Sequence, residues 1–469
     1  MKKETREYNY DWRLWSIFNA GSKALDGTHK EFEGLVKVMP NFAPVINTFL
    51  RHGEPGVLFF RMVHEYTNDI KTAHSQGKKL CLGTFVTAKH LFFAFDNVVP
   101  MWAEPMTVFG TLGLRKGTTE YMDYCCELGF TETSCSAQRG SVGAILAGLT
   151  EKPDFVICTS PGICDTNANA VQFLSSYLDL PFFQCNFPAK LTGERVNNYQ
   201  RQDFKALIAF MEEQSGSPLN VDKLRDLLEE QRRQDEITNE LYDLVRLKPC
   251  PMPPIFIMFM YAGRLTMSGR KSYTAVLESI LKVVRENAAQ GVAGTASKKE
   301  RARLLMCYID HYTTDARFWE WLDSEEISLL PSLIFSFWNK GVNYAEGRAE
   351  ESYGQIDTSS LDSMIETLAN INSRMPMTKQ LRGPYDAPGM WRDDLLCLAK
   401  IMDPDFMVYI GSMGCRNSWG VNKLLQRDCE REGIPTMLLF ADAFDDRVAS
   451  WEHCIDKISE FMHVRGIRS

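Results

Sequence analysis

The sequence lacks the features of several common classes of protein. No apolar run reaches the roughly 18–20 residues that a membrane-spanning helix requires. Residues 1–13 are polar and of mixed charge, without the apolar core of a secretory signal. Lysine and arginine form no long run and the net charge is −8, so the basic footprint of a nucleic-acid-binding protein is missing. These absences predict a cytoplasmic protein with neither a membrane nor a nucleic acid as its partner.

Several catalytic and metal-binding motifs are also absent. There is no Gly-x-Ser-x-Gly elbow for a hydrolase serine, and no two histidines are spaced four apart for a zinc site on a helix. The glycine-rich stretch 110–117 fits neither the dinucleotide-binding spacing nor the phosphate-loop spacing. No Cys-x-x-Cys pair occurs, which excludes the usual zinc ribbon and the ferredoxin cysteine run.

The chain does contain a large apolar core and many cysteines. Its 469 residues are 45% hydrophobic and 24% charged, a composition typical of a globular protein of about three domains. In a cytoplasmic chain its 13 cysteines are expected to be reduced thiols, because disulfide frameworks belong to oxidising compartments.

Two stretches of the chain resemble each other. Residues 153–164 read Pro-Asp-Phe-Val-Ile-Cys-Thr-Ser-Pro-Gly-Ile-Cys, and residues 404–415 read Pro-Asp-Phe-Met-Val-Tyr-Ile-Gly-Ser-Met-Gly-Cys. Each reads as a buried strand that runs into a tight turn, with a cysteine eleven residues after the proline. We expect two similar α/β halves, each with a thiol at the carboxyl end of a strand, where open α/β sheets bind ligands.

Strand-like and helix-like segments alternate along most of the chain, which indicates parallel sheets covered on both faces. The predicted strands are residues 79–86, 107–113, 155–158, 181–187, 303–309, 406–410 and 436–440. Residues 141–149 form a helix of small side chains that could pack close to another backbone. The predicted fold class is therefore α/β, with two Rossmann-like parallel-sheet domains. The predicted divisions are a helical N-terminal extension (1–77), the first domain (78–195), a helical connector (196–299) and the second domain (300–469).

Three cysteines differ from the other ten. Cys135, Cys164 and Cys415 each lie in a Ser/Gly-rich turn between elements, where backbone N–H groups can approach an anion or a cluster sulfide. Three thiolates from separate loops suit a [4Fe–4S] cluster with one iron open to a substrate. A zinc ion with three cysteine ligands is the alternative, and a cysteine at such a junction can also be an ordinary loop residue.

The order and spacing of these motifs resemble the 2-hydroxyacyl-CoA dehydratase family, which includes the cluster-bearing subunits of ATP-dependent benzoyl-CoA reductases. The resemblance covers about residues 79–460. It rests on Val-Val-Pro100, Ser-Cys135-Ser-Ala-Gln-Arg-Gly, Cys164-Asp, Cys415 and Gly-Ile-Pro-Thr-Met-Leu-Leu-Phe-Ala-Asp442. It implies a [4Fe–4S] cluster with one open iron site, bound by the three cysteines between two Rossmann-like domains.

The resemblance also implies an activity and partners. Members of the family add one electron to the carbonyl of an acyl-CoA thioester, and the resulting ketyl radical anion can expel an α-hydroxyl group. The protein is thus expected to be a lyase of the dehydratase type, with a paralogous second subunit and a separate ATP-hydrolysing iron–sulfur activator. A subunit of a low-potential acyl-CoA reductase is the first alternative. An electron-relay subunit without its own substrate site is the second.

The sequence departs from the family pattern in the helix before Pro100. Relatives often carry Pro-x-Glu there, whereas residues 87–91 read Thr-Ala-Lys-His-Leu, without a glutamate. If that acid transfers protons in relatives, Lys89 and His90 are the candidate catalytic residues that could replace it. A lone histidine can equally be structural.

Overall fold

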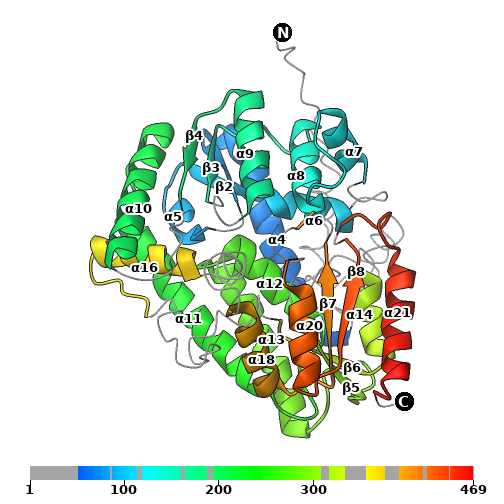
Figure 1. Cartoon of the computed structure of the whole chain (residues 1–469). Coiled ribbons are helices and arrows are strands. Elements are labelled where there is room, and N and C mark those ends of the chain that lie inside the picture. The colour runs from blue at the N-terminus through cyan, green and yellow to red at the C-terminus, as the bar shows by residue number, and fades with distance from the viewer. Residues whose placement is uncertain are drawn as a thin grey trace.

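The computed structural model describes residue 19 and residues 51–84, 87–113, 119–159, 164–186, 194–307, 316–332, 355–374, 390–412, 414–415, 420–442 and 444–467. Two four-stranded parallel sheets and many helices make up these parts of the chain (Figure 1). They confirm the predicted α/β class. The part of the predicted N-terminal extension before residue 51 lies, except for residue 19, outside the described residues, and the domain boundaries stay a prediction. No helix in the described ranges is long and apolar enough to cross a membrane.

The first sheet has the strand order β2-β1-β3-β4, with all neighbours parallel. Its strands are β1 (Lys79–Gly83), β2 (Val98–Trp102), β3 (Phe155–Cys158) and β4 (Phe182–Gln184). Every residue of β2 and β3 is buried, as expected for a parallel sheet covered on both faces.

The second sheet repeats this arrangement with the order β6-β5-β7-β8. Its strands are β5 (Ala302–Met306), β6 (Ile327–Leu330), β7 (Phe406–Gly411) and β8 (Thr436–Phe440). The two Pro-Asp-Phe motifs begin β3 and β7, which occupy the same position in the two sheets. Their aspartates have the same role: Asp154 accepts the backbone N–H of Leu80 at 2.7 Å, and Asp405 accepts that of Arg303 at 2.9 Å. The expected similarity of the two halves is confirmed, because they share both the strand order and this hydrogen bond.

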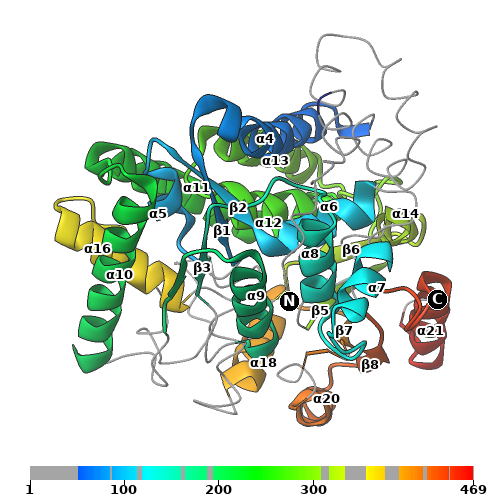
Figure 2. The same cartoon turned by 90° about the horizontal axis from the view of Figure 1, so that it is seen from above.

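Helices cover both sheets and connect them (Figures 1 and 2). The first half contains α5 (Lys89–Phe93), α6 (Ala103–Gly113), α7 (Thr119–Glu127), α8 (Ser136–Leu146) and α9 (Asp165–Leu178). The connector contains α10 (Glu194–Ser215), α11 (Val221–Val245), α12 (Phe256–Met267) and α13 (Lys271–Gln290), and α4 (Glu54–Thr72) packs on α12 and α13. The second half contains α14 (Ala316–Ser324), α16 (Leu361–Arg374), α18 (Met390–Met402), α20 (Asn422–Arg431) and α21 (Trp451–Val464).

The predicted strand at residues 107–113 is wrong, because these residues belong to α6. The run Thr-Val-Phe is strand-like, but close packing against α8 overrides that local preference. At Gly140 of α8 an added Cβ would lie 2.6 Å from the side chain of Thr107, and at Gly143 it would lie 1.9 Å from the carbonyl oxygen of Tyr121. The small residues of α8 thus let α6 and α7 approach it closely, as expected for that helix.

Two edge strands, β2 and β6, escaped prediction. The first contains Pro100, which suggests a break but is compatible with an edge strand because such a strand needs hydrogen bonds on one side only. The second is a run of only four residues, Ile-Ser-Leu-Leu, which gives a weak strand signal.

Candidate functional site

The three cysteines of the turn motifs lie at the ends of regular elements. Cys164 is the residue before α9, and its Sγ accepts the N–H of Asn167 at 3.4 Å. Cys135 stands in the same position before α8. Cys415 follows the carboxyl end of β7, where its N–H donates to the carbonyl of Ser412 at 3.0 Å. Two of the thiols therefore lie at helix N-termini, where backbone N–H groups favour negative charge.

The turns of the two halves touch. A Cβ added at Gly414 would lie 2.3 Å from the backbone nitrogen and 2.4 Å from the Cα of Cys135. Only glycine allows the loop after β7 to approach the start of α8 this closely. In Figure 1 the arrowheads of β7 and β8 point toward α6 and α8. The structure thus brings Cys135 and Cys415, which are 280 residues apart in the chain, to one place.

The thiols also act on each other. Burial, together with the negative charges that Cys415 and Asp442 can carry, raises the pKa of Cys135 to about 12. Burial, followed by the charges of Cys135 and Cys415, raises the pKa of Cys164 well above its usual value. The backbone N–H groups of Gln138 and Asn167 oppose these effects without reversing them. Thiolates at this place need a positive partner, which a metal cluster provides.

The donor set suits a metal group that several thiolates bind together. Among the described residues, no three Cys, His, Asp or Glu side chains form a site for one ion. Three thiols from separate turns, two of them at helix N-termini, fit the irons of a cluster, which places each thiolate on a different iron.

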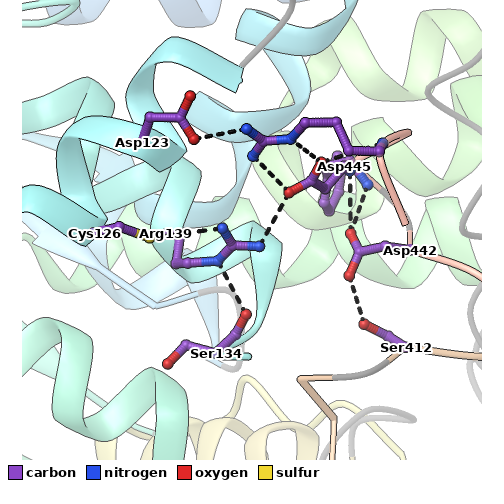
Figure 3. A network of polar contacts seen from close by, with 9 residues as sticks. Asp123, Cys126, Ser134, Arg139, Ser412, Asp442 and Asp445 are labelled. Carbon is purple, nitrogen blue, oxygen red and sulfur yellow. Dashed lines mark hydrogen bonds and ion pairs between the residues drawn. The ribbon is translucent and has the colours of Figure 1, made fainter. Parts of the chain in front are cut away.

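Asp442 follows β8, and its negative charge acts on Cys135. Figure 3 shows its contact with Ser412. Its carboxylate accepts the hydroxyl of Ser412 at 3.0 Å and the backbone N–H groups of Phe444 and Asp445 at 3.1 and 3.2 Å. Burial raises its pKa, while the hydroxyl of Ser136 and these donors lower it. The carboxylate joins the turn before Cys415 to the start of α8.

A buried ion pair joins the same two halves (Figure 3). Arg139 of α8 donates to the carbonyl of Ser134 at 3.1 Å and to Asp445 at 3.3 Å, with both charged side chains almost completely buried. Asp445 also binds Arg447, which in turn reaches Asp123 of α7. Sequence reasoning missed this pair, although Arg139 stands within the motif that contains the first cysteine.

Glu104, near the start of α6, was missed as well. It is buried, and one of its carboxylate oxygens accepts the side-chain amides of Gln138, at 2.9 Å, and of Asn167. Each of these partners lies three residues after a cysteine of the site. Glu104 thereby couples the first turns of α8 and α9, and the thiols that precede them.

The predicted catalytic residues, Lys89 and His90, lie on α5, close after the carboxyl end of β1. Both side chains are buried. The Nζ of Lys89 lies 4.9 Å from the centroid of the Trp102 ring and donates to the carbonyl of Thr87 at 3.3 Å. Burial lowers the pKa of Lys89 to about 7, and the charge of Glu104 partly opposes this effect. Glu104 thus contacts both thiol-bearing helices, and its charge acts on Lys89.

These features define a class: an α/β protein of two similar parallel-sheet halves, with neighbouring thiols where the sheet ends of the two halves meet. Residues 84–463 match the family model described as 2-hydroxyglutaryl-CoA dehydratase, D-component, so the chain belongs to that family. It is 21% identical over 409 residues to the alpha subunit of lactoyl-CoA dehydratase of Anaerotignum propionicum, covering 81% of this chain and 89% of that protein. It is 20% identical over 419 residues to a benzoyl-CoA reductase subunit of Thauera aromatica, covering 84% and 91%. The resemblance seen in the sequence is confirmed.

Proposed function

We propose that this protein is the [4Fe–4S] subunit of a 2-hydroxyacyl-CoA dehydratase-type enzyme, with Cys135, Cys164 and Cys415 as the cluster ligands. The observation that carries the proposal is the backbone contact between Gly414 and Cys135, which joins the thiol-bearing turns of the two halves. Family membership and the names of both relatives support an acyl-CoA thioester as the substrate.

When bound, the cluster would supply single electrons to the thioester carbonyl of the substrate. The chain's own residues hold these half-buried thiols in place. The Arg139–Asp445 pair and Asp442 fix the two halves against each other, and Glu104 fixes α8 relative to α9. A separate ATP-hydrolysing iron–sulfur activator would deliver the electrons, and a paralogous second subunit would complete the enzyme.

Lys89 is the residue that we propose for proton transfer. A general acid or base works best when its pKa lies near the working pH, and the pKa of Lys89 is lowered to about 7. His90 is less suited to that task, because burial lowers its pKa to about 3 and keeps it neutral. We therefore assign proton transfer to Lys89 and a hydrogen-bonding role to His90.

A reductase-type subunit is the second candidate, since the benzoyl-CoA reductase relative covers this chain as fully as the dehydratase relative does. Electron paramagnetic resonance of the anaerobically purified, reduced protein would test both candidates. Addition of lactoyl-CoA should change the spectrum if the protein is of the dehydratase type, and addition of benzoyl-CoA should do so if it is of the reductase type. A spectrum that responds to neither ester would favour an electron-relay subunit and contradict the proposal.

A further inference from the structure

A chain of buried polar groups fixes the orientation of His90. Arg264 of α12 donates to Asp235 of α11 at 2.8 Å, and the amide nitrogen of Gln231 donates to the same carboxylate oxygen at 2.6 Å. The amide oxygen of Gln231 then faces Nε2 of His90 at 3.1 Å. Because an amide oxygen can only accept, Nε2 must carry the hydrogen. The carboxylate of Asp235 thus determines, through Gln231, which nitrogen of His90 is protonated.

The other ring nitrogen, Nδ1, is consequently a bare acceptor. Burial and the positive charges of Arg264 and Lys89 lower the pKa of His90 to about 3, although the bond to Gln231 opposes them, so the ring is neutral at pH 7. Among the described residues, neither Nδ1 of His90 nor Oγ1 of Thr87 has a hydrogen-bond partner, and both atoms are buried. Buried polar atoms without a partner are costly, so a pair of them at one place points to a ligand or an ordered water.

Both residues line the same small hollow. Its volume is about 10 Å³, and its walls include Thr87, Lys89, His90, Arg264, Ser268 and Ile371. The Cδ2 edge of the His90 ring packs against Gly269, where an added Cβ would lie 2.6 Å away. The ring edge with Nδ1 is the opposite one. A volume of this size accommodates about one water molecule or one hydroxyl group.

We propose that this hollow binds a single hydroxyl group, which donates to Nδ1 of His90 and bonds Oγ1 of Thr87. An anionic oxygen is a poor occupant, because it has no hydrogen to offer the Nδ1 lone pair. A hydroxyl both donates and accepts from one atom, as the two unpaired atoms require. We assign the α-hydroxyl of a 2-hydroxyacyl thioester as the occupant, an assignment that rests on the proposed function. Gln231 and Asp235 are then positioning residues, which act through His90.

The orientation of His90 can be tested without substrate or activity. In the full-length protein labelled with ¹⁵N-histidine, NMR should show His90 with a protonated Nε2 and a bare Nδ1 between pH 5 and 8, with the signal assigned by His90→Gln. Gln231→Met removes the acceptor at Nε2 and should shift the ring toward the other tautomer. Gln200→Met, a change at a buried glutamine of α10, is the matched control. A protonated Nδ1 in the unaltered protein, or no response to Gln231→Met, would overturn the proposal.

The ligand is tested with esters that differ by one hydroxyl. Lactoyl-CoA and 2-hydroxyglutaryl-CoA are compared with propionyl-CoA and glutaryl-CoA on the anaerobically purified protein. At least one hydroxy ester should shift the Nδ1 signal and bind about tenfold more tightly than its deoxy partner, and Thr87→Val should remove the difference. Equal binding of each pair would overturn the hydroxyl site while leaving the proposed function intact. If neither hydroxy ester bound, the assigned ligand and the proposed function would both be contradicted, but not the His90 tautomer.

Discussion

Gly414→Ala should separate the two cysteine turns. The added Cβ would lie 2.3 Å from the backbone nitrogen of Cys135, whereas ordinary contacts begin near 3.4 Å, so the turns must move apart by about 1 Å. Backbone atoms on both sides leave no flexible side chain to yield. Overpacking of this kind costs about 1–3 kcal/mol. The change should therefore displace Cys415 relative to Cys135 and lower the iron content, without removing any thiol.

The assay is iron per chain after anaerobic purification, measured beside the free energy of unfolding in urea. Gly433→Ala is the matched control: its Cβ meets nothing within 4 Å, but its φ of +82° makes alanine strained by about 1–2 kcal/mol. Both variants should thus lose similar stability, while only Gly414→Ala loses iron. Normal iron in Gly414→Ala, or equal loss in both variants, would refute the idea that this contact positions the thiols.

Further predictions concern the buried charges. The pKa of Lys89 is lower in the folded protein than in the unfolded chain, so the folded form is favoured as pH rises from about 7 to 10. The free energy of unfolding, measured in urea and compared with that of Lys89→Met, should therefore rise by about 2 kcal/mol between pH 7 and 9. If the difference between the two proteins did not change with pH, the lowered pKa would be contradicted. Glu104→Gln removes a negative charge that raises the pKa of Lys89, so it should lower this pKa further and move the acidic limb of the pH–activity profile to lower pH. An unchanged acidic limb would contradict a role of Lys89 in proton transfer. Arg139→Leu should destabilise the fold by about 3–5 kcal/mol, because it leaves the buried Asp445 with fewer cationic partners. The control Arg427→Leu, at an ion pair on the surface, should cost less than about 1 kcal/mol. Similar urea midpoints for the two variants would contradict this account.

The repeated architecture could be predicted because it leaves a local signal. Pro-Asp-Phe marks the start of β3 and of β7, and the aspartate is needed to bind the neighbouring strand. The central strands are continuous apolar runs, as burial on both faces demands. The edge strands β2 and β6 gave weaker signals, because an edge tolerates proline and short length.

The site could be predicted only in part. Cysteines in Ser/Gly-rich turns are visible in the sequence, and Cys135, Cys164 and Cys415 do lie at neighbouring element ends. The residues that hold these turns together were invisible, since Arg139 and Asp445 are 306 positions apart and meet only in the folded chain. The tautomer of His90 likewise depends on partners from other helices, so the sequence motif around it carried no sign of its role.

The claim that Cys135, Cys164 and Cys415 bind one [4Fe–4S] cluster is tested most directly by the metal content of single-cysteine variants. The anaerobically purified protein should be brown and contain about four irons and four acid-labile sulfides per chain. Cys415→Ala should lose them, while Cys397→Ala, a change on α18 away from the turns, should keep them. A colourless protein with zinc, or equal iron content in the two variants, would contradict the account.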